Sequence, residues 1–281
     1  MTRSILITGC SSGIGLDAAR ALRGRGWRVF ASCRKAEDVE RLRAQGLDSL
    51  VLDHDEPASI RAAVETVLEG CDGALDALFV NGAHGLPARV EDLPRGALRA
   101  IFETNLFGPV ELVNAVLPAM RAADGGRGRG RVVFNSSVLG FAAMPWRGAY
   151  SATKYAMEGI ADTLRLELDA TGIEVVLIQP GPIATRIREN SIPHFERWIE
   201  VDAAREREAY RAELVPRLYA PGEHEDRFEL APAAVTKALV HALESPRPRA
   251  RYRITVPTRA GAVLKRLLPT RALDRLLLGR G

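Results

Sequence analysis

The sequence predicts an α/β fold in which a seven-stranded, mostly parallel sheet is covered by helices on both faces. Short apolar runs typical of buried strands alternate with stretches of helical length along most of the chain. A glycine-rich turn follows the first apolar run and leads directly into the first helical stretch. No internal repeat interrupts this alternation. Right-handed crossovers between successive strands then give a doubly wound arrangement.

Each element is placed by its apolar pattern and by the turn residues that bound it. Strands are expected at Ser4–Thr8, Arg28–Ser32, Ser49–Leu52, Ala77–Asn81, Arg131–Asn135, Glu174–Gln179 and Tyr252–Val256. Helices are expected at Gly15–Arg25, Ala36–Gln45, Pro57–Glu69, Pro94–Asn105 continuing to Met120, Ala149–Ala170 and Pro232–Leu243. The glycine-rich patch Asp124–Gly130 is interpreted as a flexible surface connection. Ligands of such sheets bind outside the carboxyl ends of the strands.

Length and composition favour an ordinary globular protein. A chain of 281 residues can form one large α/β domain or two small ones. We interpret 1–281 as a single domain, with a substrate lid at about 183–228 and a helical tail at about 259–280. Cys10, Cys33 and Cys71 lack metal-ligand spacing, so no metal is expected, and their small number fits a reducing cytoplasm. The sequence contains no apolar run of about eighteen residues, so no membrane-spanning helix is expected. No signal peptide is expected either.

The net charge of +4 does not indicate a nucleic-acid partner. The basic residues are spread along the chain and interleaved with Asp and Glu, and no basic stripe contains aromatic residues. A small-molecule substrate is expected instead.

Ser137, Tyr150 and Lys154 form the most informative group of candidate catalytic residues. Tyr150 and Lys154 are four residues apart, which on a helix places both side chains on one face. The ammonium of Lys154 can then lower the pKa of the phenol, which is ordinarily about 10. The hydroxyl of Ser137 can hold a carbonyl oxygen while the phenol protonates it. These residue types predict carbonyl reduction, provided that a bound cofactor supplies a hydride.

The glycine-rich turn predicts a phosphate-binding loop for that cofactor. It has the sequence Gly9-Cys10-Ser11-Ser12-Gly13-Ile14-Gly15. Glycines let backbone amides approach a pyrophosphate, and the following helix N-terminus carries a partial positive charge. Glycines also build ordinary loops, so the turn alone leaves both interpretations open.

With these motifs the chain resembles the short-chain dehydrogenase/reductase family over roughly residues 3–185. The matching motifs are Thr8-Gly9-x-x-x-Gly13-x-Gly15, Asn105 within Thr104–Gly108, Ser136-Ser137, Tyr150-x-x-x-Lys154 and Pro180-Gly181-Pro182-Ile183-Ala184-Thr185. The chain is most similar to the branch of hydroxysteroid and retinol dehydrogenases and bacterial NADP-dependent aldehyde reductases, through Gly9–Gly15, Cys33-Arg34-Lys35 and the segment Val263–Pro269. The resemblance implies a Rossmann-type fold and a homo-oligomer assembled through helices near residues 105 and 150.

The resemblance also implies a role for each matching residue. Lys154 binds the nicotinamide ribose, and Asn105 holds a water that leads from Lys154 to solvent, although Asn105 can instead cap or kink a long helix. Ser11, Ser12 and Ile14 join the glycines at the pyrophosphate. The remaining implied cofactor contacts are Asp53 and His54 at the adenine, Asn81, Gly82 and Ala83 at the adenosine ribose, and Pro180, Gly181, Ile183 and Thr185 at the nicotinamide.

One segment departs from the family pattern. Asn81-Gly82-Ala83-His84 stands where the family has Asn-Asn-Ala-Gly. His84 adds bulk where the backbone usually runs close to the cofactor. A non-catalytic NADP(H)-binding sensor or scaffold is the alternative function, and this departure is its only support.

Arg34 predicts a preference for NADP(H). No carboxylate follows the second strand until Glu37, whereas Arg34 can make a bidentate contact with the 2′-phosphate. A surface arginine in a basic loop is the alternative.

The sequence admits two interpretations of the segment that would bind the substrate and two of the C-terminal tail. Apolar residues between about 183 and 228 are interpreted as a mobile lid over a medium or large apolar substrate, or as helices that pack on the body of the protein. The basic, leucine-rich tail Arg259–Arg280, broken by Pro269, is expected to pack on the core or on a partner subunit, with contact to a membrane surface as the less favoured interpretation.

Overall fold

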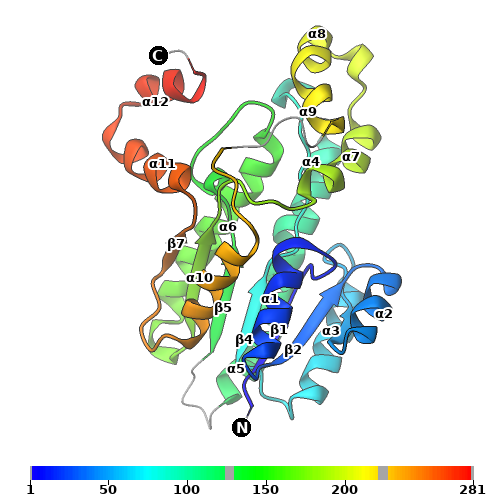
Figure 1. Cartoon of the computed structure of the whole chain (residues 1–281), viewed down its shortest axis with the longest axis vertical. Coiled ribbons are helices and arrows are strands. Elements are labelled where there is room, and N and C mark those ends of the chain that lie inside the picture. The colour runs from blue at the N-terminus through cyan, green and yellow to red at the C-terminus, as the bar shows by residue number, and fades with distance from the viewer. Residues whose placement is uncertain (1, 124–129, 221–226, 280–281) are drawn as a thin grey trace.

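A computed structural model of the chain describes residues 2–123, 130–220 and 227–279. Its centre is a seven-stranded sheet in the order β3-β2-β1-β4-β5-β6-β7, in which every adjacent pair is parallel (Figure 1). The strands are β1 (Ser4–Ile7), β2 (Arg28–Cys33), β3 (Asp48–Val51), β4 (Ala77–Val80), β5 (Arg131–Asn135), β6 (Glu174–Gln179) and β7 (Arg251–Arg253). The predicted fold class is confirmed.

Helices cover both faces of this sheet because its strands are apolar on both sides. All four residues of β1 are buried, with Leu6 in the hydrophobic cluster of one face and Ile5 and Ile7 in that of the other. The first face is covered by α3 (Pro57–Gly70), α5 (Gly108–Ala122) and α6 (Gly148–Glu167). The second is covered by α1 (Gly13–Gly24), α2 (Ala36–Ala44) and α10 (Ala233–Glu244).

Two predicted elements end three residues earlier than expected. The last strand stops at Arg253 because Thr255 caps the next helix, its hydroxyl accepting a hydrogen bond from the Thr258 amide at 3.4 Å. The helix expected to reach Ala170 ends at Glu167, and a 3-10 turn, η5 (Asp169–Thr171), leads to Gly172 at φ +75°.

The long helix predicted before β5 is continuous but not uniform. It consists of α4 (Arg95–Phe102), a π-helical turn η2 (Glu103–Phe107) and α5. Asn105, which is fully buried, lies in the π-helical turn. Such turns place an extra residue in the helix and are frequent at functional sites.

The expected lid lies beyond the carboxyl ends of the strands (Figure 1). It contains α7 (Ile187–Trp198), η6 (Val201–Ala203), α8 (Arg207–Ala209), η7 (Tyr210–Leu214) and α9 (Val215–Tyr219); residues 221–226 of the expected range lie outside the described residues. Phe195, Tyr210, Leu214 and Leu218 are buried in a third hydrophobic cluster together with Ile101 of α4. For these four lid residues the structure shows packing on the body, which was the alternative to a pocket lining.

The tail forms α11 (Val256–Leu267) and α12 (Thr270–Leu277), with Pro269 between them as expected. Thr258 and Ala262 of α11 are buried, and the Lys265 ammonium donates hydrogen bonds to the carbonyl of Phe141 and, at 3.1 Å, to the hydroxyl of Tyr155. The tail is therefore attached to the body through α11. No helix among the described residues combines the length and apolarity needed to cross a membrane. Of the predicted flexible connection Asp124–Gly130, residues 124–129 lie outside the described residues.

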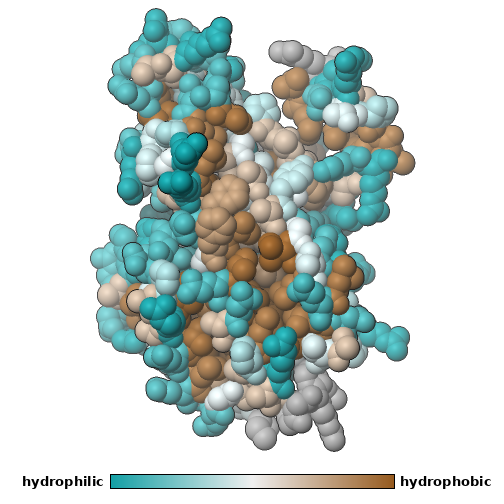
Figure 2. Space-filling model, turned by 180° about the vertical axis from the view of Figure 1, so that it is seen from behind, coloured by the Kyte–Doolittle hydropathy of each residue, from teal (hydrophilic) through white to brown (hydrophobic). Residues whose placement is uncertain are grey.

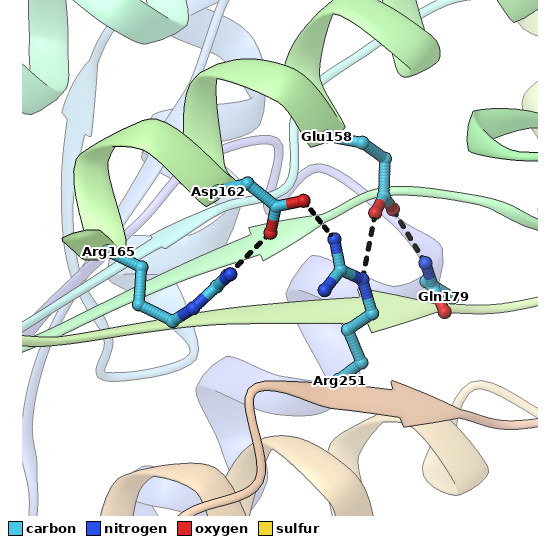
Figure 3. Close-up of polar contacts among 5 residues, drawn as sticks. All are labelled: Glu158, Asp162, Arg165, Gln179 and Arg251. Carbon is cyan, nitrogen blue, oxygen red and sulfur yellow. Dashed lines mark hydrogen bonds and ion pairs between the residues drawn. The ribbon is translucent and has the colours of Figure 1, made fainter.

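A partly buried ion-pair network joins α6 to β6 and β7 (Figure 3). Glu158 accepts hydrogen bonds from Gln179 Nε2 at 2.9 Å and from Arg251 Nε at 3.2 Å. Arg251 also contacts Asp162 at 2.5 Å, and Asp162 contacts Arg165 at 2.6 Å. Because Glu158 lies one turn after Lys154, this network fixes the helix that carries the candidate catalytic residues.

Candidate active site

The glycine-rich turn between β1 and α1 has the shape of a cradle that side chains would close. Gly9 has φ +70° and Gly13 has φ +58°, both in the region that favours glycine. A Cβ at Gly9 would lie 2.7 Å from the Cα of Gly82, and one at Gly15 would collide with the carbonyl of Gly9. A Cβ at Gly13 would lie 3.1 Å from Thr185 Cγ2, so the nicotinamide loop expected from the sequence packs against this turn. These features fit a bound dinucleotide.

A chain of hydrogen bonds joins the ends of β1, β4 and β5 to α6. The hydroxyl of Thr8 accepts from the amides of Asn81 and Gly82, each at 2.9 Å. Asn135 Nδ2 donates to Asn81 Oδ1 at 2.9 Å, and Lys154 Nζ donates to the Asn135 carbonyl at 2.8 Å. Lys154 is thus held from β5, in contact with the strand ends that line the expected cofactor site.

The structure brings Ser137, Tyr150 and Lys154 together. Ser137 follows β5 and accepts a hydrogen bond from the Leu139 amide at 3.1 Å, which fixes its side chain. The hydroxyl of Ser137 lies near enough to the phenol of Tyr150 to act on its pKa. The Lys154 ammonium lies 5.6 Å from the centre of the Tyr150 ring.

The electrostatics of this group differ from the expectation. Burial raises the pKa of Tyr150 to about 12, while the hydroxyl of Ser137 and the positive charge of Arg147 act to lower it. Burial lowers the pKa of Lys154 to about 8, against the opposing effect of the Glu158 charge. The cation that lowers the pKa of the phenol is therefore Arg147, and the Lys154 ammonium bonds instead to the Asn135 carbonyl.

Asn105 holds the segment that departs from the family pattern. Its Oδ1 accepts from the His84 amide at 3.0 Å, and its Nδ2 donates to the His84 carbonyl at 2.9 Å and to the Thr153 hydroxyl at 3.3 Å. The imidazole of His84 stacks on that of His194 in α7, with ring centres 3.5 Å apart. The bulk of His84 is thus taken up by contact with α7. The water-holding role of Asn105 stays a prediction.

The imidazole of His54 lies in the space that a side chain at position 82 would need. A Cβ at Gly82 would lie only 3.2 Å from His54 Cε1, so the imidazole occupies the space beside the missing side chain. His54 is 7% exposed, and its Nδ1 donates to the Thr104 carbonyl at 3.1 Å. His54 therefore packs against Gly82.

We expect His54 to make folding stability depend on pH. Burial lowers the pKa of His54 from 6.5 to about 4. Between these values the unfolded chain binds a proton that the folded chain excludes, so stability falls as the pH falls through this window, by about 3 kcal/mol for this group. Urea unfolding of wild type and His54→Asn at pH 7 and pH 4 measures the effect. The variant keeps a donor toward Thr104 and should lose less stability on acidification; an equal loss in both proteins would contradict this.

Two of the residues expected at the adenosine end follow neighbouring strands, Arg34 after β2 and Asp53 after β3. Arg34 is exposed. Its positive charge adds to the effect of burial in lowering the pKa of His84 and of His194. Asp53, which follows β3, accepts a hydrogen bond from the Asp55 amide at 3.1 Å, a local turn contact. Arg41 of α2 donates to the Ser11 carbonyl of the glycine-rich turn at 2.7 Å.

The expected nicotinamide loop is fixed at both ends. The Pro180 carbonyl accepts from the Val138 amide at 2.7 Å, so this loop lies beside Ser137. A Cβ at Gly181 would collide with Thr255 Oγ1, and the Ala184 amide donates to the Leu230 carbonyl at 2.9 Å.

Arg147, Arg41 and His194 were not predicted from the sequence as residues near the candidate site. Arg147 lies three residues before Tyr150, a helical spacing that could have indicated it. Arg41 and His194 carry no such signal, because tertiary packing alone brings α2 and α7 to the site.

Comparisons with known proteins agree with this geometry. The family described as short chain dehydrogenase matches residues 3–195. The "Uncharacterized oxidoreductase YbbO" of Escherichia coli (strain K12) is 40% identical over 279 residues, which are 99% of this chain and 95% of the relative. "Retinol dehydrogenase 16" of Homo sapiens is 34% identical over 256 residues, 88% of this chain and 79% of the relative.

Two solved structures show the same architecture. An actinorhodin polyketide ketoreductase with NADPH has a TM-score of 0.71 at 26% identity, covering 92% of this chain and 97% of that one. A short chain dehydrogenase/reductase from Burkholderia phymatum in complex with NAD has a TM-score of 0.77 at 22% identity, covering 100% and 96%, and shows the fold. The chain belongs to the short-chain dehydrogenase/reductase family. It is an NAD(P)-dependent oxidoreductase that acts on CH–OH or carbonyl groups.

Proposed function

We propose that this enzyme uses NADP(H) to reduce an aldehyde or ketone to an alcohol, reversibly. The observation that carries the proposal is the nearness of the Ser137 and Tyr150 hydroxyls beside Lys154, at the carboxyl edge of the sheet. A carbonyl oxygen placed against both hydroxyls has one fixed hydrogen-bond donor and one proton donor. A sensor that only binds cofactor has no use for this arrangement.

Tyr150 acts as the general acid. With a pKa of about 12 the phenol keeps its proton near neutral pH. It gives this proton to the carbonyl oxygen as negative charge develops there, while Ser137 donates a hydrogen bond to the same oxygen. The bound dinucleotide supplies the hydride. In the reverse direction tyrosinate is the base, so alcohol oxidation favours higher pH.

The chain's own residues would hold the cofactor at three points. The amides of the turn Gly9–Gly15 would bind the pyrophosphate, Lys154 would bind the nicotinamide ribose, and Arg34 would bind the 2′-phosphate. Arg34 is exposed and has no ion pair among the described residues, whereas Lys35 is paired with Glu37 at 3.2 Å. Arg34 is therefore the side chain that supports NADP(H) over NAD(H).

We expect Arg34→Ser to lower kcat/KM for NADPH about tenfold or more and to change kcat/KM for NADH little. The reason is the loss of a charge-assisted contact with the 2′-phosphate alone. Steady-state kinetics with both cofactors checks this, with Lys35→Ser as the matched control. An unchanged NADPH preference in Arg34→Ser, or a wild type that prefers NADH, would contradict the assignment.

A homo-oligomer in the cytoplasm is part of the proposal. Apolar side chains gather along the middle of the rear face of the molecule (Figure 2). The large apolar side chains exposed on η2 and α6 are Phe107, Tyr155, Ile160 and Leu166. They lie on the helices near residues 105 and 150 through which the family resemblance implies assembly.

The proposed reaction is tested by comparing wild type with Tyr150→Phe on a panel of aldehydes and ketones. NADPH consumption and alcohol formation are measured together, since the proposed reaction requires them in equal amounts.

A further inference from the structure

The tail helix α11 is attached to the body of the protein by one face only. Thr258 and Ala262 are buried. Lys265 donates hydrogen bonds to the Phe141 carbonyl and to the Tyr155 hydroxyl, and its ammonium lies 4.8 Å from the centre of the Tyr155 ring. Steps of four and three residues place Thr258, Ala262 and Lys265 on the same side of the helix. The opposite side of α11 therefore points away from the body.

That opposite side carries a row of apolar side chains, which we call the apolar stripe: Val256, Ala260, Val263 and Leu267. They follow one another at steps of four, three and four residues and so line one face of α11. Val256 is 63% exposed, Val263 55% and Leu267 73%. Single exposed apolar residues are ordinary, but a continuous row on one helix indicates a surface that another molecule covers.

The helix α12 continues this exposed apolar surface. None of its residues is buried, and Leu276 and Leu278 at its end are each about half exposed. Both helices stand out from the body at the same end of the molecule as the lid (Figure 1). A projecting pair of helices with apolar side chains outward is suited to a broad, flat partner.

Cations border the apolar stripe. Arg259 and Arg266 are exposed and lie three residues after Val256 and Val263, so each is a neighbour of the stripe on the helix surface. Between Val256 and Gly279 the only acidic residue is Asp274, against five basic residues: Arg259, Lys265, Arg266, Arg271 and Arg275. Within the described parts of the chain none of these five makes an ion pair, whereas the lid arginines Arg186 and Arg211 are paired with carboxylates.

This charge decides between two kinds of partner. A second copy of the chain, related by a two-fold axis, would place Arg259 and Arg266 against the same cations of its partner, and like charges across an interface oppose association. An anionic lipid surface instead attracts them. Helices that lie in a membrane interface have an apolar face with lysines and arginines beside it, which is the pattern of α11.

We propose that α11 binds the surface of an anionic phospholipid membrane. The apolar stripe enters the boundary between headgroups and acyl chains, and Arg259 and Arg266 contact the lipid phosphates. The inner side of α11 reaches the candidate active site, because Phe141 follows the turn η4 (Val138–Gly140) after Ser137, and Thr255 at the start of α11 packs against Gly181. Membrane binding would thus bring the Ser137 side of the site close to the lipid, whatever the substrate is.

The test is co-sedimentation of the purified full-length enzyme with phospholipid vesicles. Wild type should pellet with vesicles of equal parts phosphatidylcholine and phosphatidylglycerol, with an apparent affinity about tenfold or more above that for phosphatidylcholine alone. Added salt should weaken this binding, because it screens the attraction between the arginines and the lipid phosphates.

Two variants separate the apolar and the charged contributions. Val263→Ser combined with Leu267→Ser should lower the affinity for the anionic vesicles about tenfold or more. Arg266→Gln should lower it about fivefold and make it less sensitive to salt. These side chains are exposed, so the variants should fold like wild type. Val51→Ser is the control, because Val51 is 44% exposed on β3, outside the tail, and its loss should change the affinity less than about twofold.

Three results would overturn the proposal. The first is a wild type that stays in solution with anionic vesicles or pellets equally with neutral ones. The second is unchanged vesicle binding after loss of Val263 and Leu267. The third is a wild type that ignores vesicles while the double variant forms a smaller assembly in size-exclusion chromatography, which would assign the stripe to a second copy. Carbonyl reduction is measured without vesicles, so its presence or absence is decided separately.

Discussion

Replacing Tyr150 by phenylalanine should lower kcat for carbonyl reduction by about 100- to 10,000-fold, the usual contribution of a positioned general acid. The change removes one oxygen and keeps the ring, so packing in the site is preserved. Ser137 remains as a hydrogen-bond donor to the carbonyl oxygen but has no acidic proton to give near neutral pH. The loss should therefore appear in kcat, with little change in the affinity for NADPH.

Tyr155→Phe is the matched control for this result. Tyr155 lies on the same helix but is 40% exposed, and its hydroxyl contacts Lys265 of the tail. Its loss should leave kcat within about threefold of wild type, as for most surface substitutions. Wild-type kcat in Tyr150→Phe on an active substrate would show that the proton comes from another group.

Arg251→Met should destabilise the protein by about 3 kcal/mol. Arg251 is the cation that neutralises Glu158, whose side chain is 10% exposed. Removing one partner of a largely buried pair leaves the other charge uncompensated, and Gln179 alone then contacts the carboxylate. The free energy of unfolding from urea titration at neutral pH measures the loss.

Arg165→Met provides the comparison within the same network. Within the described residues Arg165 pairs only with Asp162, whose side chain is 39% exposed, so its removal should cost less than about 1 kcal/mol. Glu158→Gln together with Arg251→Met should recover part of the loss, because the double change leaves no buried charge. Equal losses of unfolding free energy in Arg251→Met and Arg165→Met would show that the charge of Glu158 does not need Arg251 to neutralise it.

The sheet and the candidate catalytic residues could be predicted from the sequence because both depend on local patterns. Buried strands appear as short apolar runs, and the spacing of Tyr150 and Lys154 fixes their relative position on one helix. The glycine-rich turn is equally local, since its φ angles at Gly9 and Gly13 admit almost no other residue.

What the sequence could not supply depends on contacts between distant segments. Nothing near Gly82 shows that His54 fills the adjacent space, nor that His84 stacks on His194, more than a hundred residues later. The sequence of the lid around Phe195 and Tyr210 would be equally apolar whether these side chains lined a pocket or formed a core. Only the fold shows that they form a core. The electrostatic partner of Tyr150 was missed for the same reason, because burial decides how far each charge acts.

The position of the Tyr150 phenol relative to a bound nicotinamide is the most direct measurement. In a crystal structure of the complex with NADP(H), the phenol oxygen should lie on the order of 4 Å from the reactive carbon of the ring, so that one carbonyl group fits between them. A complex with a closed lid in which the phenol faces away from that carbon, with no space for a carbonyl group beside Ser137, would contradict proton transfer from Tyr150.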